Sequence, residues 1–318
     1  MKTARTLRTL LLAGITALAA SSGTSHAAES GKEIRIGYQK GDALALLRAN
    51  GKLEARLAQE GAAANWIEFP GGPQLLEALN AGSIDFGETG ETPPIFAQAA
   101  GADFIYLANE PASPAGEAIL VPKSSNIKTV ADLKGKKVAL NKGSNVHYLL
   151  VRALEQAGLG WRDIRPVYLA PADARAAFQS GNVDAWVIWD PYLAAAQKQL
   201  DTRTLKNGEG LVDNYIFYLA RRPWIIANPG IGKIVLEELH AVGEWTNKNP
   251  EAAAKELAPI IGLPQDTTLL AVKRERYGLE PITPATVAAQ QKIADTFYSL
   301  KLIPKSLDIR SATLPSGK

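Results

Sequence analysis

Short apolar runs of strand length alternate along the chain with longer stretches in which apolar residues recur every three or four positions. This alternation predicts an α/β fold in which strands and helices follow one another. The clearest helical stretch covers 146–157 and has an unbroken apolar face that ends at Gly158. The predicted strands are 34–38, 66–69, 84–87, 104–108, 118–121, 138–140, 167–169, 185–189 and 215–220.

The order of these elements is used twice, about a hundred residues apart. The segments 36–42 and 138–144 each pass from an apolar strand through an amide side chain, Lys and Gly to a residue suited to starting a helix. The segments 82–86 and 181–185 repeat in the same way, and the two offsets are 102 and 99 residues. We therefore expect two similar lobes whose loops face one another across a cleft. Helix N-termini in such a cleft can hold an anion.

The second repeat is predicted to be inserted into the first. The strand at 118–121 carries the chain into the second lobe, and the strand at 215–220 returns it. Two crossings imply a hinge rather than a flexible linker. The predicted limits are 28–117 plus 219–310 for lobe 1, 118–218 for lobe 2, and 311–318 for a C-terminal tail that has no periodic pattern and is expected to be disordered.

The first 27 residues differ in kind from the rest. A basic start precedes an apolar run at 10–20, and the small residues at 25–27 follow, a pattern typical of a signal peptide cleaved near Ala27. The apolar run is too short to span a bilayer. We expect an exported, periplasmic protein. Without the three basic residues of this segment, 32 basic residues face 32 acidic ones, which gives no basic surface for nucleic acid.

Composition also excludes several kinds of site. The chain has no cysteine, which excludes disulfides, thiolate metal sites and a cysteine nucleophile. Only two histidines follow the first 27 residues, so we expect no transition-metal site, and no cofactor-binding motif occurs. Ser144 and His147 are three apart at a helix start, which is capping geometry, and no G-x-S-x-G elbow surrounds the serine. We therefore expect no catalysis.

Four strand-to-helix junctions are the candidate binding elements: 39–42, 88–92, 142–145 and 189–191. Each presents backbone N–H groups without an intrahelical partner, and their partial positive charge suits an oxyanion. The side chains of Gln39, Thr89, Ser144 and Asn145 add neutral donors.

Basic and aromatic side chains also stand at these junctions. Lys40 and Lys142 are possible anion partners, although a solvated loop lysine is the favoured interpretation. Trp186 and Trp189 are three apart on a strand and point to opposite faces. We expect Trp186 in the core and Trp189 as an apolar wall for a ligand.

The segments 38–41, 82–90, 130–139 and 171–192 resemble the periplasmic aliphatic-sulfonate-binding proteins of ABC importers. The resemblance covers about 34–309. It implies a two-lobed type II periplasmic binding protein fold, with a mixed sheet flanked by helices in each lobe and an alkanesulfonate between the lobes. It also implies delivery to a membrane permease for sulfur acquisition, and we expect a monomer without cofactor or metal. The ligand contacts it implies are Gln39, Lys40, Gly41, Asp42, Thr89, Gly90, Glu91, Ser144, Asn145, His147, Trp189 and Asp190.

Carboxylates near the expected ligand need an explanation. A sulfonate has three acceptor oxygens and no proton to donate, so Asp42, Glu91 and Asp190 would repel it at contact. We expect them to bind neighbouring backbone groups or an amine at the far end of the substrate. The chain departs from the family pattern at Asp42, Thr92 and 145–146, where small or hydroxyl residues are more usual.

Two alternative functions stay open. The protein could be a receptor for taurine, nitrate or another oxyanion, although the aromatic wall argues against a small inorganic anion. It could also be an enzyme of the thiamine-precursor type on the same fold. The signal peptide and the absence of cysteine argue against that enzyme.

Overall fold

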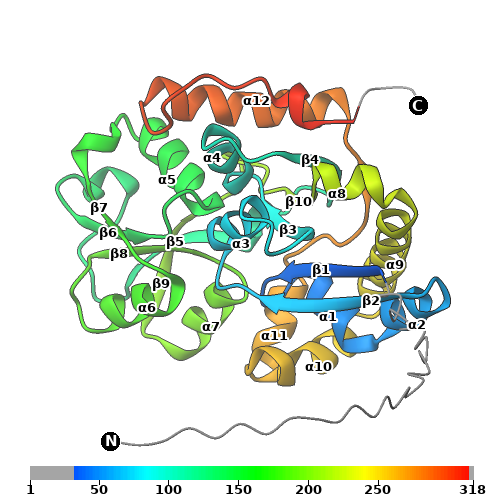
Figure 1. Ribbon diagram of the computed structural model, residues 1–318. Helices are drawn as coiled ribbons and strands as arrows, with labels where there is room; N and C mark the ends of the chain where they lie inside the picture. The colour runs from blue at the N-terminus through cyan, green and yellow to red at the C-terminus, as the bar shows by residue number, and fades with distance from the viewer. Residues whose placement is uncertain (1–31, 315–318) are drawn as a thin grey trace, which may run out of the picture. The chain divides into compact units, whose positions relative to one another are not determined.

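The computed structural model describes residues 32–314, so the predicted signal peptide and residues 315–318 lie outside it. Two mixed sheets belong to one compact unit, and helices cover both (Figure 1). The first sheet has the order β11-β4-β10-β3-β1-β2 and the second the order β7-β6-β8-β5-β9. The strands are β1 (Lys32–Tyr38), β2 (Ala62–Glu68), β3 (Phe86–Gly90), β4 (Phe104–Asn109), β5 (Glu117–Pro122), β6 (Lys137–Leu140), β7 (Arg165–Tyr168), β8 (Ala185–Trp189), β9 (Thr202–Asn207), β10 (Ile216–Arg221) and β11 (Glu280–Pro281).

The helices follow the strands in the order that the apolar pattern predicts. None of the helices within residues 32–314 is long and apolar enough to cross a membrane. They are α1 (Ala43–Asn50), α2 (Lys52–Gln59), α3 (Gly72–Asn80), α4 (Pro93–Ala99), α5 (Asn145–Gln156), α6 (Pro171–Gln179), α7 (Tyr192–Gln199), α8 (Arg222–Ala227), α9 (Pro229–Lys248), α10 (Pro250–Ile261), α11 (Gln265–Val272) and α12 (Pro284–Ser299).

The internal repeat of the sequence reappears in the pairing of the strands. In the first sheet β1 lies parallel between β2 and β3, and in the second β6 lies parallel between β7 and β8. Ile36 pairs with Phe86, and Val138 pairs with Ala185. These pairs are related by the same offsets of 102 and 99 residues that relate the sequence motifs. The two halves therefore share a backbone plan, and the carboxyl ends of their central strands carry the loops of interest.

The predicted lobe limits fall inside strands. β5 starts at Glu117 and lies wholly in the second sheet, whereas the predicted limit separates 117 from 118. β10 lies wholly in the first sheet, and the limit at 218–219 cuts through it. The chain passes between the sheets through 110–116 and 208–215. Two crossings were expected, and their positions are shifted by a few residues.

Two strands had no signal in the sequence, β9 and the short β11. β9 pairs antiparallel with β5 at the edge of the second sheet, and its residues are mostly half-buried. Its sequence, Thr-Arg-Thr-Leu-Lys-Asn, contains a single large apolar residue. A polar edge strand lacks the apolar run by which the other strands were recognised.

The last helix joins the two halves. Figure 1 shows α12 running over α4 and α5, and Phe297 of α12 packs against Phe96 and His147 with ring centroids 5.0 Å away in both cases. Gln290 donates to the carbonyl of Glu91 at 2.8 Å. α12 therefore contacts helices that follow strands of both sheets.

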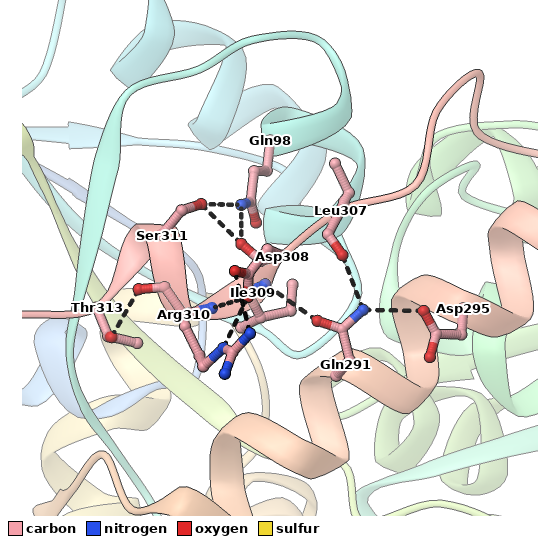
Figure 2. A network of polar contacts seen from close by, with 9 residues as sticks. All are labelled: Gln98, Gln291, Asp295, Leu307, Asp308, Ile309, Arg310, Ser311 and Thr313. Carbon is pink, nitrogen blue, oxygen red and sulfur yellow. Dashed lines mark hydrogen bonds and ion pairs between the residues drawn. The ribbon is translucent and has the colours of Figure 1, made fainter.

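The segment after α12 is ordered further than predicted. Gln98 donates to Ser311 Oγ at 3.1 Å, and Gln291 accepts from the Ile309 N–H at 3.1 Å (Figure 2). Thr313 also forms a bridge with Tyr106 of β4. Residues 311–314 differ from the expectation of disorder, because Ile309–Ala312 form a 3₁₀ helix and because Ser311 and Thr313 contact Gln98 and Tyr106.

Candidate ligand-binding site

A cavity of about 20 Å³ lies between the two sheets, where β1, β3, β6 and β8 end. The carboxyl ends of parallel strands are the usual ligand position in α/β folds. The volume suffices for about one water molecule. Of the predicted contacts, those on the cavity wall are Gln39, Asp42, Thr89, Gly90, Ser144, Asn145, Trp189 and Asp190.

Glycines allow the two sides of the cavity to touch. A Cβ atom on Gly90 would lie 1.8 Å from Asn145 Oδ1, and one on Gly41 would lie 2.9 Å from Pro191 Cδ. Gly41 also has a φ of 97°, a conformation that favours glycine. Each contact joins a loop of the first sheet to a loop of the second. The sequence therefore permits a close approach that any larger residue would obstruct.

The loops after β1 and β6 have the same backbone geometry. Asp42 and Ser144 each precede a helix with φ −88° and ψ 172°, and neither side chain caps its helix. The residues before them, Gly41 and Gly143, both have positive φ. We call these elements the α1 junction (residues 39–42 and the first turn of α1) and the α5 junction (residues 141–145 and the first turn of α5).

The α1 junction is already occupied by an acidic side chain. Glu88 Oε2 accepts from the Leu44 N–H at 3.2 Å, and Gln39 Nε2 donates to the Glu88 carbonyl at 3.1 Å. Burial raises the pKa of Glu88 well above its usual value, and the neighbouring Asp42 adds to this rise. Burial raises the pKa of Asp42 to about 7, against the opposing effect of its hydrogen bond with Glu88.

A third acid extends this cluster away from the cavity. Glu110 is buried and accepts from the Tyr218 hydroxyl at 2.6 Å. Burial raises the pKa of Glu110 to about 8. The α1 junction is therefore surrounded by carboxyl groups whose pKa values are raised.

The α5 junction carries neutral donors instead. Ser144 donates to the Asn141 carbonyl at 2.7 Å, and Asn145 Nδ2 donates to Asn214 Oδ1 at 2.5 Å. Within residues 32–314, no side-chain carboxylate accepts a hydrogen bond from the first turn of α5. Its N–H groups keep the partial positive charge of a helix N-terminus, which suits an anion.

The ends of β3 and β8 complete the polar wall. Thr89 is fully buried, and its hydroxyl has no hydrogen-bond partner in the part of the chain that the structure describes. Asp190 accepts from the Ala194 N–H at 2.9 Å and pairs with Arg274 at 3.1 Å. Burial raises the pKa of Asp190 to about 6, while Arg274 opposes that rise. Asp190 thus binds a neighbouring backbone N–H, which was one of the two roles expected for it.

The two tryptophans take the positions that the strand period predicts. Trp186 is buried in the core of the second half, in contact with Phe178 at a centroid distance of 6.0 Å. Trp189 lies on the cavity wall, edge-on to Tyr192 at 6.0 Å. Its indole supplies apolar surface beside the polar donors.

His147 is not on the cavity wall, contrary to expectation. It is fully buried, its Nδ1 accepts from the Gly143 N–H at 3.2 Å, and Trp161 lies against its ring at 4.7 Å. Burial lowers the pKa of His147 to about 3. Three residues into the helix, its side chain turns toward α12 and the core, where a neutral imidazole packs as an aromatic group.

Three other predicted contacts also lie off the wall. Lys40 is partly exposed and pairs with Glu68 at 3.7 Å, in agreement with the interpretation as a solvated lysine. Gly41 is not on the wall, but its lack of a side chain lets the loop approach Pro191 closely. Glu91 is buried and accepts from the Tyr215 N–H at 3.1 Å, and burial raises its pKa to about 8. Glu91 therefore binds backbone, which was one of the two roles expected for it.

Sequence reasoning missed five residues of the wall. Asn214 stands at the end of the second crossing with a φ of 52°, and it is buried against Asn145. Glu275 follows α11, far along the chain from every junction, and no motif marks it. The residues without a prediction are Gly72, Pro93, Asn214, Ile216 and Glu275.

A family model described as NMT1/THI5 like matches residues 58–253. The putative aliphatic sulfonates-binding protein of Escherichia coli K12 is 48% identical over 307 residues, which is 96% of each chain. The chain belongs to this family of aliphatic-sulfonate-binding proteins. Members of the family with solved structures have the same two-sheet architecture, so the predicted fold class and family are confirmed.

Two solved relatives resemble the chain over most of its length. The alkanesulfonate-binding protein of Xanthomonas axonopodis pv. citri, bound to MOPS, has 43% identity and a TM-score of 0.85, and the match covers 89% of this chain and 98% of that one. The periplasmic aliphatic sulphonate binding protein of Escherichia coli has 49% identity and a TM-score of 0.80, with 89% and 97% covered. These aliphatic-sulfonate-binding proteins are described as binding proteins and not as enzymes.

Proposed function

We propose that this protein captures aliphatic sulfonates outside the cytoplasm and delivers them to the permease of an ABC importer for sulfur acquisition. The observation that carries the proposal is the cavity between the sheets, where donors from both halves meet beside an indole ring. A sulfonate needs N–H and O–H donors for its three oxygens, and its chain needs apolar surface. The wall of this cavity offers both, in a chain with 48% identity to a relative that is named for sulfonates.

The head group is expected at the α5 junction. Ser144, Asn145 and Thr89 supply neutral donors there, and the first turn of α5 supplies backbone N–H groups. Charge-assisted hydrogen bonds contribute about 1.5–3 kcal/mol each. A few of them reach the −8 kcal/mol that corresponds to micromolar affinity. The alkyl chain is expected against Trp189.

Ligand entry requires the two halves to part. A cavity of about 20 Å³ admits water but not a sulfonate group, so entry must widen it. The crossings at 110–116 and 208–215 are the segments about which the halves can rotate. The ligand then takes the place of direct contacts such as that between Gly90 and Asn145.

Export to the periplasm completes the proposal. The E. coli relative is described as periplasmic, and the first 27 residues of this chain have the pattern of a signal peptide cleaved near Ala27. We expect the processed protein to act as a monomer that meets its permease at the membrane. N-terminal sequencing of the exported protein and its mass in solution test these two points.

Calorimetry with a panel of ligands tests the proposed function. Methanesulfonate, hexanesulfonate, taurine, nitrate and sulfate are titrated into the processed protein, and the melting temperature is measured with each. A ligand that binds the folded protein raises the melting temperature. We expect heat and a shift with the alkanesulfonates. A clear response to nitrate or sulfate, with none to any sulfonate, would refute the proposal.

A zwitterionic amino-sulfonate is a second candidate ligand. Asp42 and Glu275 are on the cavity wall, and neither forms an ion pair within the described residues. An amine at the far end of the ligand would meet these carboxyl groups. In that case Glu275→Gln weakens the binding of taurine more than that of ethanesulfonate, whereas an equal effect on both excludes the amine contact.

A further inference from the structure

The cavity wall carries acidic side chains, which would repel a bound anion. Three carboxyl groups line it, from Asp42, Asp190 and Glu275. Burial raises the pKa of Glu275 well above its usual value, so this group keeps its proton at neutral pH. Burial raises the pKa of Asp42 to about 7, so this group is partly ionised there. Asp190, with a pKa of about 6, keeps its negative charge at neutral pH. A sulfonate would therefore meet the ionised carboxylate of Asp190 on this wall, beside a partly ionised Asp42.

Arg274 is placed to cancel that charge. Its Nη1 lies 3.1 Å and 3.3 Å from the two carboxylate oxygens of Asp190, and its Nη2 donates to Gln197 Oε1. The Asp190 side chain is 2% exposed and that of Arg274 is 18% exposed. Among residues 32–314, no other carboxylate of the cavity wall forms an ion pair. Arg274 itself is not on the wall, so it acts on the cavity through Asp190.

The ion pair joins the two halves of the molecule. Asp190 follows β8 of the second sheet, whereas Arg274 follows α11, which packs on α10 and α7. The segment of Arg274 is held by the first crossing: the Arg276 N–H donates to Ser113 Oγ at 2.8 Å, and Glu275 lies against Gly116. In this arrangement of the two halves, the guanidinium of Arg274 contacts Asp190 and cancels its charge.

We infer that Arg274 is a positioning residue that determines specificity, because it neutralises Asp190 and so makes the cavity acceptable to an anionic head group. This inference rests on the proposed function. It deepens that function by assigning the compensating charge to a residue that does not touch the ligand. Without Arg274, the buried carboxylate of Asp190 would lie beside the sulfonate with no compensating positive charge, which costs binding free energy.

Four variants test the role of Arg274 by calorimetry with hexanesulfonate at pH 7.5. Arg274→Gln is expected to weaken binding at least tenfold. Asp190→Asn keeps an oxygen that can accept from the Ala194 N–H, removes the negative charge, and is expected to bind as tightly as wild type or more tightly. The double variant Asp190→Asn/Arg274→Gln is expected to bind within about threefold of wild type. Lys198→Gln, which breaks the exposed Lys198–Asp266 pair between α7 and α11, is the matched control and is expected to change nothing.

The sign of the Asp190→Asn effect separates charge cancellation from a simple tie between the halves. A structural tie predicts that Asp190→Asn weakens binding as much as Arg274→Gln and that the double variant stays weak, which would overturn the inference. Unchanged binding by Arg274→Gln would overturn it as well. If Arg274→Gln does not fold, the affinities of wild type, Asp190→Asn and the double variant are compared instead. Binding by both variants that is close to wild type supports the inference, and weak binding by both contradicts it. Absence of any sulfonate binding by wild type instead refutes the proposed function, and the inference falls with it.

Discussion

The α1 and α5 junctions have the same backbone conformation but different side chains around it. Asp42 and Ser144 share the same φ and ψ, and each follows a glycine at the end of a central parallel strand. Yet an acidic side chain, that of Glu88, accepts from an N–H of the α1 junction, whereas the α5 junction has the neutral Ser144 and Asn145 side chains at its helix start. A repeated backbone therefore does not imply a repeated ligand contact. The identity of the side chains facing each helix N-terminus decides which half attracts an anion.

This difference assigns unequal roles to the two halves. Burial raises the pKa values of the acids around the α1 junction, Asp42, Glu88 and Glu110, which means that their surroundings disfavour a negative charge. The α5 junction offers donors without that opposition. We expect the second half to hold the sulfonate head and the first half to close over it.

The largest expected effect on ligand affinity comes from blocking the contact between the halves. Gly90→Val places side-chain atoms where Asn145 Oδ1 now lies, since even a Cβ would be 1.8 Å from it. We expect hexanesulfonate affinity to fall about a hundredfold or more, equivalent to ~2.8 kcal/mol. Calorimetry measures this loss. Gly230→Ala is the control, because a Cβ at Gly230 has no neighbour within 4 Å. Wild-type affinity in Gly90→Val would mean that closure does not bring these loops together.

Exchanging the residues that precede the two helices, Asp42 and Ser144, tests the comparison directly. Ser144→Asp places a carboxylate at the α5 junction and is expected to weaken hexanesulfonate binding about thirtyfold, because like charges repel at short range. Asp42→Ser makes the reverse change at the α1 junction, because it removes a carboxylate there, and is expected to alter affinity by less than threefold. Equal effects of the two substitutions would show that both junctions contact the head group.

The acid cluster predicts how stability depends on pH. Glu110 has a pKa of about 8 when folded, above its value in the unfolded chain, so the folded state holds the proton longer. Stability from this group is therefore full below about pH 4.5 and falls as the pH rises to about 8. At ~1.4 kcal/mol per pKa unit, the loss over this range is on the order of 5 kcal/mol.

Urea unfolding at pH 5 and pH 8.5 measures this loss, and Glu110→Gln is expected to reduce it. Gln keeps an oxygen that can accept from Tyr218, so the hydrogen bond is retained while the titration is removed. An identical pH dependence in the variant would show that Glu110 titrates normally.

The smallest expected effect concerns the apolar wall. Trp189→Ala removes indole surface from the cavity and is expected to weaken hexanesulfonate binding about tenfold, at ~25 cal/mol per Å² of lost apolar burial. Methanesulfonate has almost no chain to bury, and its affinity is expected to change by less than twofold. A similar loss for both ligands would place Trp189 against the head group.

The sequence predicts the repeated framework because the framework is local. Apolar runs, glycines at turns and helix starts recur at fixed offsets, and the strands predicted from them include the central strands β1, β3, β6 and β8. The opposite faces of Trp186 and Trp189 follow from the strand period alone. Each of these features can be predicted from a few neighbouring residues of the sequence.

What the sequence does not predict depends on contacts between distant segments. Arg274 and Glu275 reach the cavity from a loop after α11, and no local pattern marks them. His147 stands at the right spacing for a ligand contact, but packing against Trp161 and Phe297 turns it into the core. β9 is recognised only through its pairing with β5.

The position of the sulfonate sulfur tests the central claim most directly. Residues 2–318 contain no methionine and no cysteine, so the ligand supplies the anomalous sulfur signal in crystals of the processed protein with hexanesulfonate. We predict a single sulfur peak within hydrogen-bonding reach of Ser144 and Asn145, with the chain toward Trp189. A peak at the first turn of α1, beside Asp42 and Leu44, would contradict the account.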